Sequence, residues 1–241
     1  DQRGVSFVGS ANLVPLGQEM EHSERAGDRA NRFRYELIVV LAAALIFGGS
    51  AVSPPSLMDD VDAVQAQIAR NMVESGDWVS ARLDGVAYLE KAPLGYWMMA
   101  VSYLAFGVSD GAARIPMALS TILLCWLAAR IGWWAFGARA GLFAGLALAS
   151  CVGLWLFTRI LIPDVVLTLA ITLALWAFLQ AMEEDGWTWP MVFWASQGVG
   201  FLLKGLIAMV FPIGAVILYW TFTRGWGDWR RLKPLAGVAV T

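Results

Sequence analysis

The sequence predicts an all-α fold, a polytopic transmembrane helix bundle with about six spans and membrane-parallel helices in its first extracytoplasmic loop. Composition is the first reason. Of the 241 residues, 59% are hydrophobic and 15% are charged, and the mean hydropathy of +0.62 lies outside the usual range of soluble domains. The second reason is the recurrence of apolar runs long enough to cross a bilayer. The third is the position of the basic residues, most of which lie before the first run, after the second run and after the sixth run.

A polar leader, residues 1–35, comes first and is expected to be flexible and cytoplasmic. The first apolar run follows it and ends at Ser53-Pro54-Pro55, which is not a small-x-small cleavage site. We therefore expect no cleavable signal peptide and assign this run as the first span.

Crossing about 30 Å of hydrocarbon takes about 20 helical residues. Six runs meet this length and define a transmembrane module over residues 36–223: 36–53, 111–131, 139–157, 165–183, 188–204 and 205–223. The apolar run Leu94–Phe106 has only about 13 residues, so we expect a helix at the outer interface. It belongs to a large outer loop, 54–110, and the chain ends in a cytoplasmic basic segment, 224–241.

The basic residues support this topology, because lysine and arginine are enriched in short cytoplasmic loops. With six spans and a cytoplasmic N-terminus, one side receives Arg25, Arg29, Arg32, Arg34, Arg130, Arg139, Arg224, Arg230, Arg231 and Lys233. The formal net charge of −2 and the scattered basic residues do not indicate a nucleic-acid partner. Membrane lipids are the expected surroundings.

An acidic cluster, Asp59, Asp60 and Asp62, opens the outer loop. It precedes residues 63–74, whose apolar positions recur at helical spacing and predict a helix lying on the membrane. Acids at a helix start commonly cap the helix and compensate its dipole. Three acids in four positions exceed that need, so a base or a metal-binding role remains open.

Further ionisable residues lie at the expected outer ends of the spans. Glu90 and Lys91 precede the interfacial helix, either as a surface ion pair or as a place where the lysine binds a lipid phosphate. Arg159, Asp164 and Lys204 lie close to hydrocarbon, where charges are expensive and usually functional. They either neutralise one another or form a site for a charged, lipid-linked substrate.

The chain from Leu57 to Arg224 carries Asp-Asp-x-Asp, Gly-Asp-Trp, Tyr-Leu-Glu-Lys-Ala-Pro-Leu with a following Tyr-Trp, Ala-Arg-Ile-Pro, Arg-x-x-x-Pro-Asp and Leu-Lys-Gly. This succession resembles the membrane glycosyltransferases of GT-C type, in the group of aminoarabinose transferases and dolichyl-phosphate-mannose protein mannosyltransferases. The resemblance implies inverting transfer of a sugar from a polyprenyl-phosphate carrier to a lipid or protein acceptor. The reaction would occur at the outer face of a bacterial inner membrane.

The resemblance also implies roles for single residues. A carboxylate of Asp59, Asp60 or Asp62 would assist the acceptor, together with Asp164. The donor would be bound by Tyr88, Lys91, Arg159 and Lys204, and Glu90 would contact a divalent metal ion, the one cofactor implied. The family's commoner opening, Asp-Glu, aligns its first aspartate with Val61, so the choice among the three aspartates stays open.

Two other classes of function remain as alternatives. A transporter or flippase would show an internal repeat and broken helices near mid-bilayer, whereas no repeat is visible and the polar motifs lie at span ends. A non-catalytic membrane subunit is the other alternative. The resemblance implies further spans beyond the sixth helix, so we expect this chain to be the N-terminal part of a longer enzyme or to work with a partner.

Overall fold

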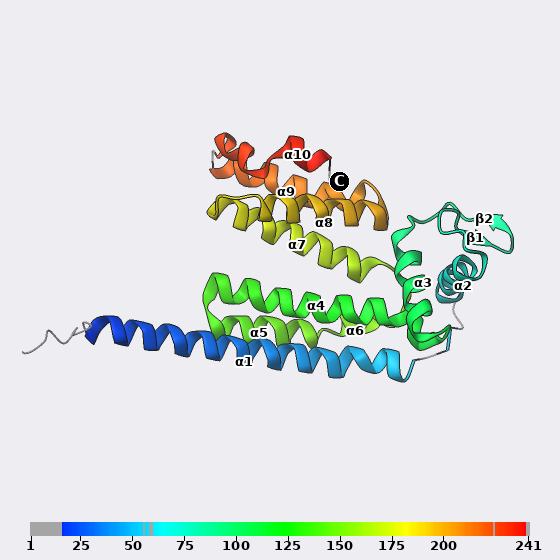
Figure 1. Cartoon of the computed structure of the whole chain (residues 1–241), viewed down its shortest axis with the longest axis horizontal. Coiled ribbons are helices and arrows are strands. Elements are labelled where there is room, and N and C mark those ends of the chain that lie inside the picture. Colours follow the sequence, from blue (N-terminus) through cyan, green and yellow to red (C-terminus); the bar gives the residue numbers. More distant parts are fainter. Residues whose placement is uncertain (1–15, 55, 58–59, 224, 240–241) are drawn as a thin grey trace, which may run out of the picture.

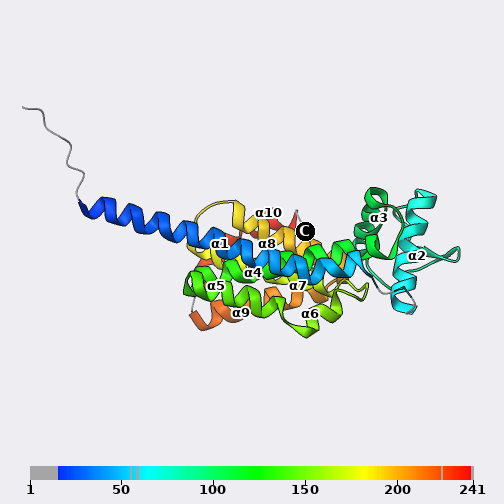
Figure 2. The same ribbon diagram turned by 90° about the horizontal axis from the view of Figure 1, so that it is seen from below.

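The computed structural model describes residues 16–54, 56–57, 60–223 and 225–239. Long helices run side by side and form a bundle, and a smaller cap, residues 60–106, lies at one end of it (Figure 1). The same arrangement is seen from below in Figure 2. The predicted all-α fold class is therefore confirmed.

In the described part of the chain the helices are α1 Leu16–Val52, α2 Asp60–Ser75, α3 Leu94–Phe106, α4 Asp110–Phe136, α5 Ala138–Ala149, α6 Val152–Phe157, α7 Asp164–Glu183, α8 Thr188–Lys204, α9 Ile207–Thr223 and α10 Pro234–Val238, with a 3₁₀ helix, η1, at Trp226–Leu232. The strands β1, Arg82–Leu83, and β2, Val86–Ala87, form an antiparallel hairpin in which Arg82 pairs with Ala87.

Each of the six predicted apolar runs is helical over most of its length. By length and composition, two single helices of the described chain, α4 and α7, are able to cross a membrane, and α3, α5 and α9 are shorter apolar helices. The number of crossings stays a prediction. The interfacial helix has the predicted bounds, because Pro93 precedes it and Gly107, with φ of 81°, follows its last turn.

Two helices differ from the sequence prediction. Helix α1 begins at Leu16, within the segment expected to be a flexible leader. That segment contains several Glu, Arg and Ala residues, which favour helix, and Arg32 pairs with Glu36 one turn later, with Nε 2.9 Å from Oε1.

The run 139–157, expected as one helix, is divided between α5 and α6. The hydroxyl of Ser150 donates to the carbonyl of Ala147 at 3.0 Å, and Cys151 is extended, with φ of −71° and ψ of 117°. Local bonding by a serine hydroxyl competes with the helical pattern, and the helix ends there. The short α6 then leads toward the end of the bundle where the cap lies (Figure 1).

Glycines allow α1, α4 and α5 to pack closely. A Cβ atom on Gly141 would lie 2.5 Å from the carbonyl oxygen of Ala129, and one on Gly145 would lie 2.6 Å from a methyl group of Val39. Small residues at such positions let helix backbones approach in a membrane bundle. These contacts hold one half of the bundle together.

The cap has an apolar core of its own. Ile68, Ala69 and Met72 of α2 are buried against Tyr96 and Met99 of α3. The first turns of α4 contribute to the same core, so the cap is attached directly to the bundle.

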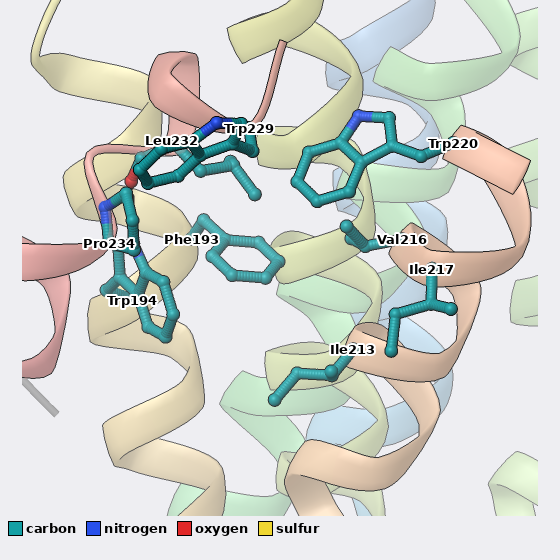
Figure 3. A pocket seen from close by; sticks show the side chains of 9 residues that line it. All are labelled: Phe193, Trp194, Ile213, Val216, Ile217, Trp220, Trp229, Leu232 and Pro234. Atoms are coloured by element: carbon teal, nitrogen blue, oxygen red, sulfur yellow. Dashed lines mark hydrogen bonds between the residues drawn. The ribbon is translucent and has the colours of Figure 1, made fainter. Parts of the chain in front are cut away.

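The opposite end of the bundle gathers aromatic and basic side chains. Trp134 donates to Glu183 at 3.1 Å, and the ammonium of Lys233 lies 3.7 Å from the ring centroid of Trp187. An apolar cavity of about 180 Å³ lies at this end, between α8, α9 and the segment that follows α9. Figure 3 shows the side chains that line it. The basic loops assigned to the cytoplasm thus lie away from the cap.

Candidate functional site

A cavity of about 450 Å³ lies where α7 begins, α8 ends and the chain enters α3. It is at the cap end of the bundle (Figure 1). Its lining comes from three segments that are far apart in sequence: Leu89, Glu90, Lys91 and Ala92; Ile162, Pro163 and Asp164; and Leu203, Lys204 and Gly205. The structure therefore brings together four of the residues singled out from the sequence.

Helix ends position two of these four side chains. Asp164 is the first residue of α7, and Lys204 is the last residue of α8, where Gly205 with φ of 69° ends the helix. A carboxylate at a helix N-terminus and a cation at a C-terminus both interact favourably with the helix dipole. The two termini lie side by side, and the ammonium of Lys204 contacts the carboxylate of Asp164 directly.

The Asp164–Lys204 pair is partly open to solvent, with 35% and 45% of the two side chains exposed. Exposed ion pairs contribute little to stability, about 0–1 kcal/mol, because water screens them. An anion that enters the cavity can therefore replace the carboxylate as the partner of Lys204 at small energetic cost.

Glu90 is held by its neighbours in the chain. The hydroxyl of Tyr88 donates to its Oε2 at 2.7 Å, and the ammonium of Lys91 lies 3.6 Å from its Oε1. The hydrogen bond from Tyr88, assisted by the charge of Lys91, lowers the pKa of Glu90. The same hydrogen bond raises the pKa of Tyr88, so this pair is a carboxylate and a neutral phenol at neutral pH.

A metal ion at Glu90 needs more ligands than the described residues supply. Among them, no group of three or more His, Cys, Asp or Glu side chains is placed to hold one. A single carboxylate next to an ammonium is a weak donor set for a divalent cation, which usually binds several oxygen ligands. The metal role of Glu90 stays a prediction, and no chemical step is assigned to it.

The three aspartates of the outer loop have different positions. Asp59 lies outside the described residues, and so does the side chain of Asp60, whose backbone begins α2. Asp62 is buried, 6% exposed, and both of its carboxylate oxygens have partners in the protein. It does not line the cavity.

Arg159 also lies outside the cavity lining. Its guanidinium carbon is 4.2 Å from the ring centroid of Trp155, and its backbone carbonyl accepts a hydrogen bond from Arg114 at 3.0 Å. Arg114 belongs to the Ala-Arg-Ile-Pro motif, but the sequence motifs gave it no role. A charged residue inside an apolar helix is the signal that points to it.

A model of the family described as dolichyl-phosphate-mannose-protein mannosyltransferase matches residues 90–241. The match includes every residue that lines the cavity except Leu89. The resemblance stated from the motifs is thus confirmed.

Two relatives are named as undecaprenyl phosphate-alpha-4-amino-4-deoxy-L-arabinose arabinosyl transferases. The one from Aeromonas salmonicida is 31% identical over 186 residues, which cover 73% of this chain and 33% of the relative. The one from Pseudomonas fluorescens, numbered 2, is 30% identical over 219 residues, which cover 84% of this chain and 36% of the relative. The chain spans about a third of the length of the curated relatives it matches.

Solved structures show the same fold. The crystal structure of ArnT from Cupriavidus metallidurans bound to undecaprenyl phosphate matches with a TM-score of 0.77 and 32% sequence identity. The match covers 85% of this chain and 39% of that one, and the apo structure of the same protein gives the same values.

Proposed function

Because this chain belongs to the dolichyl-phosphate-mannose-protein mannosyltransferase family, we propose that it forms the donor-binding part of an inverting glycosyltransferase. The sugar would pass from a polyprenyl-phosphate carrier to a lipid or protein acceptor. The observation that carries the proposal is the cavity in which Lys91 and Lys204 lie with Asp164. The similar ArnT structure contains undecaprenyl phosphate, a ligand of the class that two lysines are suited to bind.

In the proposed reaction the acceptor oxygen attacks the anomeric carbon, and the bond from that carbon to the carrier phosphate breaks. The phosphate leaves with the bonding electron pair, so it needs cations rather than a strong general acid, and Lys91 and Lys204 supply them. Asp164, freed from Lys204 by the phosphate, orients the acceptor and takes its proton. Asp59 and Asp60 stay as further candidates for this carboxylate role.

We also infer the membrane topology from helix lengths and charges. Helices α1, α4, α5 with α6, α7, α8 and α9 are the proposed spans, and α2 and α3 lie at the outer surface. The basic end of the bundle faces the cytoplasm. The cavity then opens at the extracytoplasmic face of a bacterial inner membrane, where lipid-linked donors are presented.

The decisive test is the substitution Asp164→Asn in the full-length protein. Undecaprenyl-phosphate-linked aminoarabinose serves as the donor probe, with a lipid acceptor. We expect kcat to fall by about 10²-fold or more, the usual contribution of a general base, while donor affinity changes little. The matched control is Asp84→Asn in the same outer loop. Its backbone has φ of 50°, which asparagine tolerates, and it does not line the cavity.

If Asp164→Asn retains the turnover of the Asp84→Asn control, the proposed role of the cavity is wrong. Loss of donor binding together with turnover would also contradict it, because the lysines and not the carboxylate are proposed to hold the phosphate.

A further inference from the structure

Arg114, near the start of α4, is completely buried and is bound on three sides. Its Nη2 lies 3.2 Å from the carboxylate of Asp62 on α2. Its Nε donates to the carbonyl of Arg159 at 3.0 Å, and its Nη1 donates to the carbonyl of Asp110 at 3.1 Å. One side chain thus joins the first helix of the cap, α4 and the segment before α7.

Asp62 contacts the same segment from its other oxygen. Its Oδ1 accepts a hydrogen bond from the backbone N–H of Leu161 at 2.7 Å. The carbonyl at Arg159 and the N–H at Leu161 are therefore held by two side chains that are bonded to each other. Both peptide groups are on the backbone that leads into the cavity, where Ile162, Pro163 and Asp164 form one wall.

We infer that Arg114 and Asp62 form a latch that positions residues 159–163 and, through them, the carboxylate of Asp164. Both are positioning residues, and Asp62 is neither the base nor a metal ligand. This inference rests on the proposed transfer reaction, in which the carboxylate of Asp164 must lie at a defined distance from the acceptor.

The choice of arginine supports a positioning role over a purely stabilising one. A buried ion pair is expensive to desolvate, and apolar residues of similar volume commonly match or exceed its stability. A guanidinium has donors in a fixed planar fork and can bind three acceptors in set directions, whereas an ammonium is a point charge. The three contacts of Arg114 use each of its nitrogen atoms.

The test is Arg114→Lys, which keeps the charge for Asp62 but lacks the fork. The matched control is Arg130→Lys on the same helix, since Arg130 pairs with Glu36 at 3.1 Å at the other end of the bundle. We expect both variants to fold and to bind undecaprenyl phosphate as the wild type does. Only Arg114→Lys should lower kcat, by roughly tenfold to a hundredfold, because small displacements of reacting groups have effects of this size.

A second measurement does not depend on activity. Hydrogen exchange at the amide of Leu161 should be slow in the wild type and in Arg130→Lys, and faster in Arg114→Lys. If Arg114→Lys does not fold, the double variant Asp62→Asn/Arg114→Met is used in its place. That double variant leaves no buried charge and keeps an acceptor for Leu161, and the same fall in kcat is expected.

If Arg114→Lys has the kcat of the wild type, the latch is overturned, whatever the hydrogen exchange shows. A lower kcat with unchanged exchange at Leu161 also overturns it. A rise in KM that matches the fall in kcat also overturns it, because the defect is then in binding. If the wild type transfers no sugar, the proposed function fails, and the exchange at Leu161 alone decides the latch.

Discussion

Lys91 and Lys204 are the cationic side chains among the residues that line the cavity. Replacing either with alanine should raise KM for the lipid donor by about tenfold or more, since a hydrogen bond to a charged group contributes about 1.5–3 kcal/mol. Stability should change by less than about 1 kcal/mol, because the ion pairs involved are partly exposed.

Michaelis analysis with thermal unfolding of each lysine variant checks this expectation, and Arg139→Ala at the opposite end is the control. If Lys204→Ala and Arg139→Ala change KM equally, Lys204 does not bind the donor.

The hydrogen bond from Tyr88 to Glu90 predicts a pH effect. It lowers the pKa of Glu90, so the carboxylate persists to lower pH in the wild type than in Tyr88→Phe. The variant should lose activity at a higher pH as the solution is acidified, because protonated Glu90 no longer holds Lys91 beside the cavity.

The acidic limb of kcat/KM against pH measures this shift. The control Tyr219→Phe, on α9, should not change the pH at which kcat/KM falls. If Tyr88→Phe does not change this pH either, Glu90 does not control the acidic limb.

The sequence singled out four of the residues that line the cavity, because charged side chains next to hydrocarbon are costly and usually belong to a polar functional site. It could not distinguish Asp62 from Asp59 and Asp60. The partner of Asp62 is Arg114, 52 residues away, and only tertiary packing places them together.

At the scale of helices, length and apolar content were enough to predict α3 with its bounds and helical structure in every apolar run. With 13 residues, α3 is about 20 Å long, which is short of the hydrocarbon thickness. The break between α5 and α6 was not predictable, because neither Ser150 nor Cys151 is a proline or a glycine and apolar residues flank them on both sides.

The close packing of α4 and α5 predicts that Gly141→Ala destabilises the bundle. Its new methyl group would lie 2.5 Å from a backbone oxygen, which cannot move as a side chain can. Overpacking of this kind costs about 1–3 kcal/mol. The control is Gly49→Ala in α1, where an added Cβ meets no atom within 4 Å.

Thermal unfolding in detergent compares the two alanine variants. If Gly141→Ala has the same melting temperature as the wild type, the helices do not approach as closely at this glycine as the structure describes.

For the molecule as a whole, the proposed topology predicts that the hairpin and the α4–α5 turn lie on opposite sides of the membrane. Ala87→Cys and Ala135→Cys, both exposed, report on these two places once Cys125 and Cys151 have been changed to alanine. In whole cells an impermeant thiol reagent should modify position 87 and not position 135. The reverse pattern would invert the proposed orientation.

The latch also sets an order of events during synthesis. Asp62 and Arg114 leave the ribosome before Leu161, which lies 99 residues after Asp62. Until the start of α7 has been inserted, Arg114 lacks the carbonyl of Arg159, and the cap is joined to the bundle through α4 alone. The contacts between the cap and residues 159–161 therefore form late in biogenesis, and the cap of a nascent chain stalled before residue 159 should be cut by protease more readily than the cap of the completed chain.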